Sequence, residues 1–153
     1  MAAISELKKK ISDGLYDEML LDIYVDDKVI PYQKDRYVKA LDSYVSYFGD
    51  GDIEIYSAPG RTEICGNHTD HQHGEIVAGS INDDAIAIVK KLDGNTVKVK
   101  SDGYDMIEVD ISNLELVESE KETTVSLIKG VLKGMQDRGY AIKYDITISL
   151  GKI

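Results

Sequence analysis

Residues 59–74 read Pro-Gly-Arg-Thr-Glu-Ile-Cys-Gly-Asn-His-Thr-Asp-His-Gln-His-Gly, and this stretch decides how the chain is interpreted. It holds all 3 histidines, the 1 cysteine and one of the 2 prolines of the 153-residue sequence. Gly66 and Gly74 frame its most polar part, and glycine permits positive φ angles or a close approach of backbone to a ligand. The stretch therefore predicts a loop wrapped around a small polar molecule.

The order of residue types in this stretch resembles the signature of galactokinases, within the superfamily of kinases that phosphorylate galactose, homoserine, mevalonate and phosphomevalonate (GHMP kinases). The matching positions are Ala58, Pro59, Gly60, Arg61, Gly66, His68, Thr69, Asp70 and Gly74. The sequence departs from the signature at Glu63 and Asn67, where the family usually has Asn and Glu, and at residues 71–72, where His-Gln replaces Tyr-Asn. The resemblance is therefore to a divergent form of the signature.

The resemblance implies a phosphotransferase that moves the γ-phosphate of ATP, with Mg²⁺, to the C1 hydroxyl of galactose or a related sugar. By resemblance, the substrate-binding residues are Arg61, Asn67, His68 and Asp70. A carboxylate such as Asp70 can accept hydrogen bonds from two hydroxyls, whereas Asn67 and His68 can each donate and accept. Arg61 is also the catalytic candidate, because in the family it lies near the catalytic Asp, where a positive charge offsets charge on the transferred phosphoryl group.

The length of the chain allows one domain with a real core but is short for a sugar kinase of this family. The family's Gly- and Ser-rich phosphate loop should follow the expected strand at residues 144–149, where this sequence ends with Leu150-Gly151-Lys152-Ile153. We therefore expect a truncated N-terminal portion of such a kinase, inactive by itself and without a cofactor-binding residue of its own. ATP and Mg²⁺ would act in the full-length parent.

The composition of the chain limits the classes of partner that it is expected to bind. The formal net charge is −10, so nucleic acid and anionic membranes would be repelled on average. A single cysteine cannot form an intramolecular disulfide, and the first residues lack the apolar run of a signal peptide. These features predict a cytoplasmic protein that binds neither nucleic acid nor a membrane. The partner that the resemblance implies is a small sugar.

Apolar periodicity predicts helices before the signature stretch. Ile4, Leu7 and Ile11 recur at helical spacing, and a stronger stripe ends at Gly49, a residue typical of a helix C-terminus. The members of that stripe are Tyr37, Leu41, Tyr44, Val45 and Phe48. Residues 22–34 are expected to be a connecting stretch. Residues 1–50 are accordingly assigned to a helical N-terminal region, and residues 51–153 to a truncated kinase domain with a sugar-binding loop at 58–74.

After the signature stretch the pattern predicts strands at residues 85–89, 96–100, 107–111 and 144–149, separated by Asp-Gly turns and one helix. Thr123 or Thr124 can cap that helix. Its expected inner stripe is Ile128, Val131, Leu132 and Met135. Antiparallel strands with helices to one side predict an α+β fold, and the family's fold, similar to domain 2 of ribosomal protein S5, is of that type.

Two alternatives to the kinase interpretation stay open. The density of imidazole, carboxylate and thiol groups at His68, His71, His73, Asp70 and Cys65 is compatible with a metal-binding module. The chain could also be a non-catalytic sugar-binding relative. Apart from these alternatives, we expect self-association through an exposed, truncated edge at the strand 144–150, because unpaired strand edges associate.

Two further residues of the stretch have open roles. Glu63 is either a partner of Arg61 or an exposed acid. Cys65, between Ile64 and Gly66, is expected to pack as a small apolar residue rather than to react.

Overall fold

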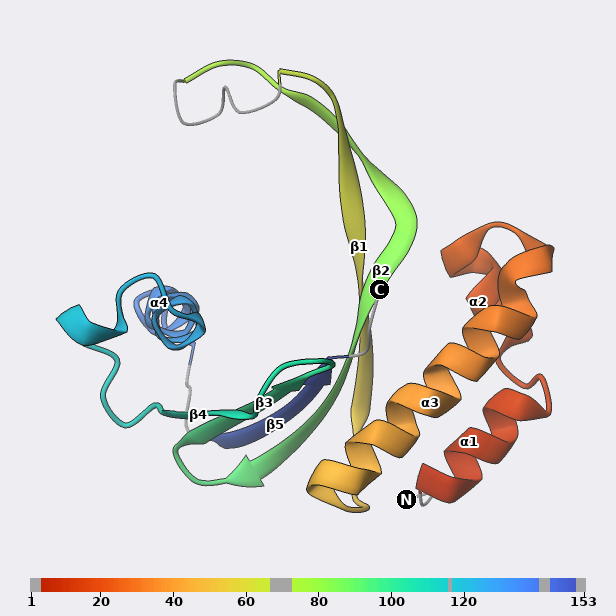
Figure 1. Ribbon diagram of the computed structural model, residues 1–153, viewed down its shortest axis with the longest axis horizontal. Helices are drawn as coiled ribbons and strands as arrows, with labels where there is room; N and C mark the ends of the chain where they lie inside the picture. Colours follow the sequence, from red (N-terminus) through yellow and green to blue (C-terminus); the bar gives the residue numbers. More distant parts are fainter. Residues whose placement is uncertain (1–3, 67–72, 116, 141–143, 151–153) are drawn as a thin grey trace.

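The structure is a computed structural model that describes residues 4–66, 73–115, 117–140 and 144–150. Its elements follow in the order α1 (Ile4–Ser12), α2 (Asp17–Tyr24), the 3₁₀ turn η1 (Asp27–Val29), α3 (Ile30–Phe48), β1 (Glu54–Cys65), β2 (Val77–Asp93), β3 (Thr96–Ser101), β4 (Ile107–Asp110), the 3₁₀ turn η3 (Glu118–Glu120), α4 (Thr124–Gln136) and β5 (Tyr144–Leu150) (Figure 1). The expected helices and strands are present, and the α+β class is confirmed.

The strands form one five-stranded sheet in the order β1-β2-β5-β3-β4. Pairing is antiparallel between β1 and β2, β2 and β5, and β3 and β4, whereas β3 and β5 are parallel. The parallel pair differs from the expected all-antiparallel sheet. It arises because α4 carries the chain from the edge strand β4 back across the sheet, and such a crossover allows parallel neighbours.

The position of β5 corrects the expected route of self-association. Residues Tyr144–Leu150 pair with β2 on one side, and part of the strand pairs with β3 on the other. β5 is therefore an interior strand, and the edges of the sheet are β1 and β4. The reason for expecting association through residues 144–150 is wrong, because an interior strand already has partners for its backbone groups.

The first apolar core lies between the N-terminal helices and the first two strands. Its buried residues are Ile4, Ile11, Leu20, Tyr24, Ile30, Tyr37, Ala40, Leu41, Tyr44, Ile86 and Ile88. The stripe predicted for α3 is largely confirmed, although Val45 is 38% exposed. The expected connection at residues 22–34 is wrong over most of its length, since α2 ends at Tyr24 and α3 begins at Ile30 with Pro31 in its first turn, where proline is tolerated. Because the helices share this core with β1 and β2, the division of the chain at residue 50 stays a prediction.

A second core lies on the opposite face of the sheet. Val97, Val99, Val109 and Ile111 are buried there, with Ile128 and Leu132 of α4 packed against them. The strand register places Lys100 on the same face as Ile88, since both pair with Ser149, and side chains alternate along β3. Val99 therefore faces away from α1–α3.

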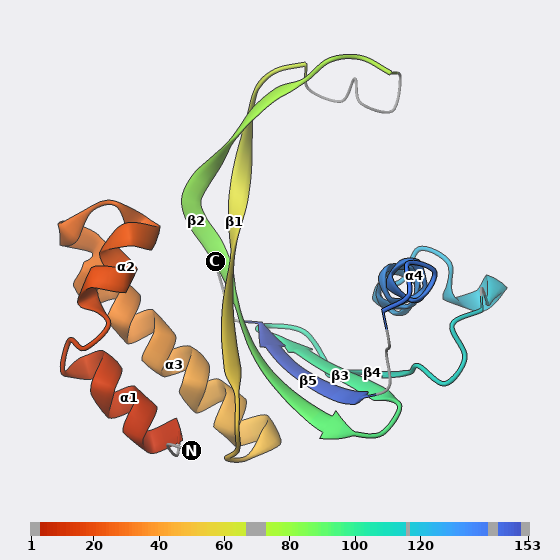
Figure 2. The same cartoon turned by 180° about the vertical axis from the view of Figure 1, so that it is seen from behind.

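The helices consequently flank both faces of the sheet, as Figures 1 and 2 show, and the expectation of helices to one side is wrong. The stripe predicted for α4 is half confirmed. Ile128 and Leu132 pack against the second core, whereas Val131 and Met135 are 57% and 41% exposed.

The β1–β2 hairpin extends past both layers of helices (Figures 1 and 2). We call its outer part, Arg61–Cys65 of β1 and Val77–Ser80 of β2, the hairpin arm. The arm carries Arg61–Cys65 of the signature stretch, so the fold presents these residues on a two-stranded projection.

Candidate functional site

The signature stretch is only partly a loop. β1 continues to Cys65 and β2 begins at Val77, so residues 58–65 of the expected loop are strand. Asn67, His68 and Asp70, together with Thr69, His71 and Gln72, lie outside the described residues. The structure therefore locates Arg61 among the four predicted substrate-binding residues, and the roles of all four stay predictions.

Arg61 lies at the start of the hairpin arm, opposite Ser80 on β2. Its side chain is 66% exposed, and its Nη2 donates a hydrogen bond of 2.9 Å to Oε1 of Glu63. Residues i and i+2 of a strand point to the same face, which brings the two side chains together. Of the two roles left open for Glu63, the structure supports that of a partner for Arg61.

Backbone carbonyl groups approach two glycines of the stretch closely. A Cβ on Gly66, whose φ is 86°, would lie 2.3 Å from the carbonyl oxygen of Glu75. A Cβ on Gly60 would lie 3.0 Å from the carbonyl oxygen of Asp83. These positions therefore favour glycine for steric reasons that are independent of any ligand.

Cys65 is exposed, so the expectation that it packs as an apolar residue is wrong. The reason is its place on the hairpin arm, which none of the described helices covers (Figure 1). Within the described ranges no group of three or more His, Cys, Asp or Glu side chains could hold a metal ion. His68 and His71, on which the metal-binding alternative depends, fall outside those ranges.

A buried polar cluster lies at the base of the hairpin, where β1 and β2 meet α2 and α3. We call Tyr24, Arg36, Ser57 and Asp84 the Asp84 cluster. Asp84 is 2% exposed, and it accepts hydrogen bonds from the Arg36 guanidinium, from Ser57 Oγ and, at 2.9 Å, from Tyr24 Oη. Arg36 also donates to the backbone carbonyl of Asp84. One carboxylate thus joins four elements of secondary structure.

The cluster fixes its own protonation states. Burial by itself would raise the pKa of the Asp84 carboxyl, but hydrogen bonds from Ser57, Arg36 and Tyr24 outweigh burial and hold this pKa below its ordinary value. Burial, aided by hydrogen bonds with Tyr37 and Asp84, raises the pKa of the Tyr24 hydroxyl. Asp84 is therefore an anion paired with Arg36, and Tyr24 is a neutral donor.

A cavity of about 620 Å³ opens beside this cluster. Its lining residues are Ile23, Tyr24, Val25, Ile55, Tyr56, Ser57, Pro59, Ser80, Ile81, Asn82 and Asp84. The cavity runs along the base of the hairpin toward Ser80, the partner of Arg61. Its lining includes Pro59, which belongs to the signature stretch.

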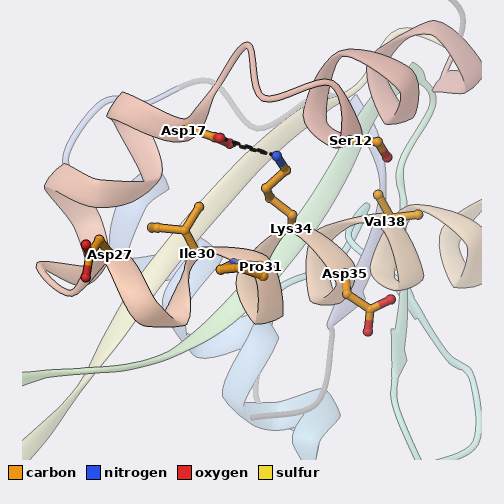
Figure 3. A pocket seen from close by; sticks show the side chains of 8 residues that line it. All are labelled: Ser12, Asp17, Asp27, Ile30, Pro31, Lys34, Asp35 and Val38. Carbon is orange, nitrogen blue, oxygen red and sulfur yellow. Dashed lines mark hydrogen bonds and ion pairs between the residues drawn. The ribbon is translucent and has the colours of Figure 1, made fainter.

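A second hollow, of about 530 Å³, lies among the helices (Figure 3). Lys34 reaches across it to Asp17, with 3.0 Å between Nζ and Oδ1, while Asp27 and Asp35 stand at its rim. Its lining contains no residue of the signature stretch. We therefore assign the candidate site to the hairpin and not to this hollow.

Sequence reasoning did not single out the Asp84 cluster. A signal was available, because Asn82-Asp83-Asp84 interrupts an otherwise apolar run that continues from Ala85 to Val89, and a carboxylate in a buried strand requires partners. Its main partner, Arg36, adjoins Tyr37 on α3 and has no sequence feature that points to residue 84.

Comparison with known proteins shows which proteins this chain is similar to. The family model described as the galactokinase galactose-binding signature matches residues 42–91. A galactokinase of Fusobacterium nucleatum is 31% identical over 93 residues, which are 60% of this chain and 24% of the relative. A galactokinase of Enterococcus faecalis is 26% identical over 103 residues, covering 67% of this chain and 27% of the relative.

A solved structure agrees with the sequence matches. The crystal structure of Lactococcus lactis galactokinase complexed with galactose superimposes with a TM-score of 0.65 at 25% identity, over 76% of this chain and 31% of that chain. The fold and the signature of this chain are thus similar to those of galactokinases. The matches to the family model, to the curated galactokinases and to the solved structure support an interpretation of the chain as an N-terminal galactokinase-type segment. The chain spans about a quarter of the length of the curated relatives it matches.

These matches favour the galactokinase hypothesis over the metal-binding module. Among the helices that the structure describes, none has the length and apolar character to cross a membrane.

Proposed function

We propose that this chain supplies the sugar-recognising part of a galactokinase-type phosphotransferase. The observation that supports the proposal is the coincidence of the matched signature, residues 42–91, with the β1–β2 hairpin that displays Arg61. The galactose-bound crystal structure is that of the Lactococcus lactis relative, and a galactose-like hexose is the corresponding ligand proposed for this chain.

Recognition in this proposal depends on a small set of polar side chains. Asp70 accepts hydrogen bonds from two sugar hydroxyls, Asn67 and His68 each donate and accept, and Arg61 faces the hydroxyl that becomes phosphorylated. A sugar that lacks one matched hydroxyl would leave a buried polar partner unpaired, at a cost of about 1 to 3 kcal/mol. Selectivity among hexoses follows from that cost.

The chemistry proposed for the whole protein is transfer of the ATP γ-phosphate, with Mg²⁺, to the C1 hydroxyl of the sugar. Within this chain, the described residue that contributes is Arg61, whose exposed guanidinium is held by Glu63. A fixed positive charge there keeps a nearby base ionised and stabilises the charge of the phosphoryl group in the transition state. We propose that the 153-residue chain binds sugar without phosphorylating it, and that it acts in the cytoplasm.

Titration of the isotope-labelled chain with D-galactose, followed by amide chemical shifts, tests the proposal. Galactose should shift the amides of Arg61 and residues 66–74, and D-glucose, its C4 epimer, should shift them far less at the same concentration. Equal responses to both sugars, or none to either, would contradict sugar recognition by this stretch. Galactose-dependent release of ADP by this chain would contradict the part of the proposal that denies it kinase activity.

A further inference from the structure

The register of the hairpin contains an irregularity directly before Arg61. Pro59 pairs with Asp84, but Arg61 pairs with Ser80. One residue of β1, Gly60, therefore lies opposite three of β2, residues 81–83. Bulges of this kind bend a strand, increase its twist and re-aim the side chains that follow. The direction of the hairpin arm is thus decided at this bulge.

We infer that the Asp84 cluster is a positioning device that fixes the direction of the hairpin arm, and with it the placement of Arg61. The part of this inference that concerns sugar rests on the proposed function. The part that concerns the direction of the arm does not.

The cluster forms hydrogen bonds with both strands of the hairpin where the bulge begins. Counted outward from the base of the hairpin, Asp84 is the last regularly paired residue of β2 before the bulge. Ser57, whose hydroxyl donates a hydrogen bond to Asp84, lies two residues before Pro59 on β1. Within the bulge, Nδ2 of Asn82 lies 3.5 Å from the carbonyl oxygen of Tyr24. The hydroxyl of the same Tyr24 donates a hydrogen bond to the carboxylate of Asp84. The end of α2 therefore holds the bulge at two points.

The other anchor is α3, through Arg36. Its guanidinium contacts both the carboxylate and the backbone carbonyl of Asp84 and also donates to Oε1 of Gln33 at 3.1 Å. Contacts to two different atoms of Asp84 restrain the orientation of this residue as well as its distance from the helix. These contacts tie the backbone at residue 84 to α3, whose buried side chains form much of the first core.

The arm itself offers little that could set its direction. Ile64 and Val77 are 72% and 57% exposed, and Arg61 contacts Glu63 of its own strand. The apolar core residues of β2, Ile86 and Ile88, lie on the inner side of Asp84. The Asp84 cluster is thus the outermost set of buried contacts between the hairpin and the helices in the described part of the chain.

A buried ion pair is a costly way to gain stability, because well-packed apolar residues of similar volume often serve as well or better. What hydrogen-bonded charges add is geometry, since they tolerate few alternative arrangements. An ion pair beside the bulge that precedes Arg61 fits a role in orientation.

Residual dipolar couplings of backbone amides in weakly aligned samples measure that orientation. In the wild-type chain, the couplings of the arm (61–65 and 77–80) and those of β3 and β4 should fit one alignment tensor. Tyr24→Phe removes one hydrogen bond to Asp84 while keeping the ring, and Asp84→Asn removes the charge. We expect the couplings of the arm, but not those of β3 and β4, to depart from the common tensor, more strongly in Asp84→Asn.

Tyr56→Phe is the matched control, because Tyr56 is an exposed tyrosine of the same hairpin whose hydroxyl contacts Glu54 and not the cluster. It should leave all couplings unchanged. If Tyr24→Phe lowers the free energy of unfolding while the arm stays in the common tensor, the cluster is structural only and the inference is overturned. Should Asp84→Asn fail to fold, Tyr24→Phe and Ser57→Ala decide the question by the same measurement.

Galactose titration of the same samples separates this inference from the proposed function. If the wild type binds galactose, a reoriented arm should weaken binding by about fivefold or more in Tyr24→Phe, the equivalent of one lost hydrogen bond. Unchanged affinity in a variant whose arm has moved would overturn the link to sugar. If the wild type binds no galactose, the proposed function fails, and the couplings still decide whether the cluster positions the arm.

Discussion

The base and the arm of the β1–β2 hairpin differ in almost every physical respect. At the base, Asp84 is 2% exposed and is held by groups from two helices and the neighbouring strand. On the arm, the Arg61 side chain is 66% exposed and its ion pair is to Glu63, two residues away. The difference teaches that Arg61, the described residue with a predicted chemical role, is not held in place by buried contacts of its own. In our inference, its placement depends on the Asp84 cluster, which takes no direct part in the chemistry.

The largest effect on stability is expected at the base. Asp84→Ala leaves the Arg36 guanidinium buried without its carboxylate, and removal of one member of a buried pair typically costs about 3 kcal/mol or more. Urea denaturation of the wild type and the variant measures the difference in the free energy of unfolding. Asp83→Ala, one residue away, provides the control. A loss below about 1 kcal/mol for Asp84→Ala would show that the cluster is not an energetically coupled unit.

Protonation of Asp84 should have a smaller effect than its removal, since the neutral acid keeps its shape. The pKa of Asp84 is lower in the folded protein than its ordinary value. Its contribution to stability is therefore fully present above the unfolded pKa of about 3.9 and is lost as the pH falls through the folded pKa.

Denaturation curves recorded between about pH 6 and pH 2 measure this loss. The Asp84→Asn variant should be less stable at neutral pH and should lose less stability on acidification than the wild type. Identical pH dependence in the two proteins would mean that other carboxylates account for the acid sensitivity.

Much of the first core could be predicted from sequence, because local patterns decide it. Tyr37, Leu41 and Tyr44 recur at the spacing of one helical face, and all three are buried. The start of α3 could not be recognised so easily, because Pro31 and the acidic residues 26–27 resemble a connection. Proline in the first turn of α3 satisfies the same pattern, and only packing against the core distinguishes the two.

Long-range pairing set the limit of prediction. The strand predicted at residues 144–149 from its alternating sequence is present. Nothing in its residues indicates that it inserts between β2 and β3 or that it runs parallel to β3. The contacts of Asp84 span 48 residues to Arg36 and 60 to Tyr24, so they too depend on the fold. The signature stretch could be recognised because its residue types follow one another directly in the chain. Its described part shows Arg61 with Glu63, one of the two roles weighed for that acid.

The bulge between base and arm should respond to substitution with an intermediate effect. Gly60→Ala adds a Cβ that would lie 3.0 Å from the carbonyl oxygen of Asp83 and 3.2 Å from the side chain of Ile81. Crowding of this size typically costs about 1 kcal/mol or more. Gly79→Ala is the matched control on the partner strand, because its Cβ would meet nothing within 4 Å. Equal changes in the free energy of unfolding for the two variants would mean that the bulge is not sterically tight.

The smallest effect on stability is expected on the arm. Arg61→Ala removes an exposed ion pair with Glu63, and such pairs contribute about 0 to 1 kcal/mol. The free energy of unfolding in urea should therefore change little, whereas any affinity for galactose should fall strongly, because the proposed role of Arg61 lies in the site. Glu63→Gln is the informative partner variant: it keeps the shape and a hydrogen-bond acceptor but removes the charge, so it should weaken galactose binding less than Arg61→Ala. If Arg61→Ala destabilised the fold as much as Asp84→Ala, the contrast between base and arm would fail, and Arg61 would be a structural residue of the hairpin.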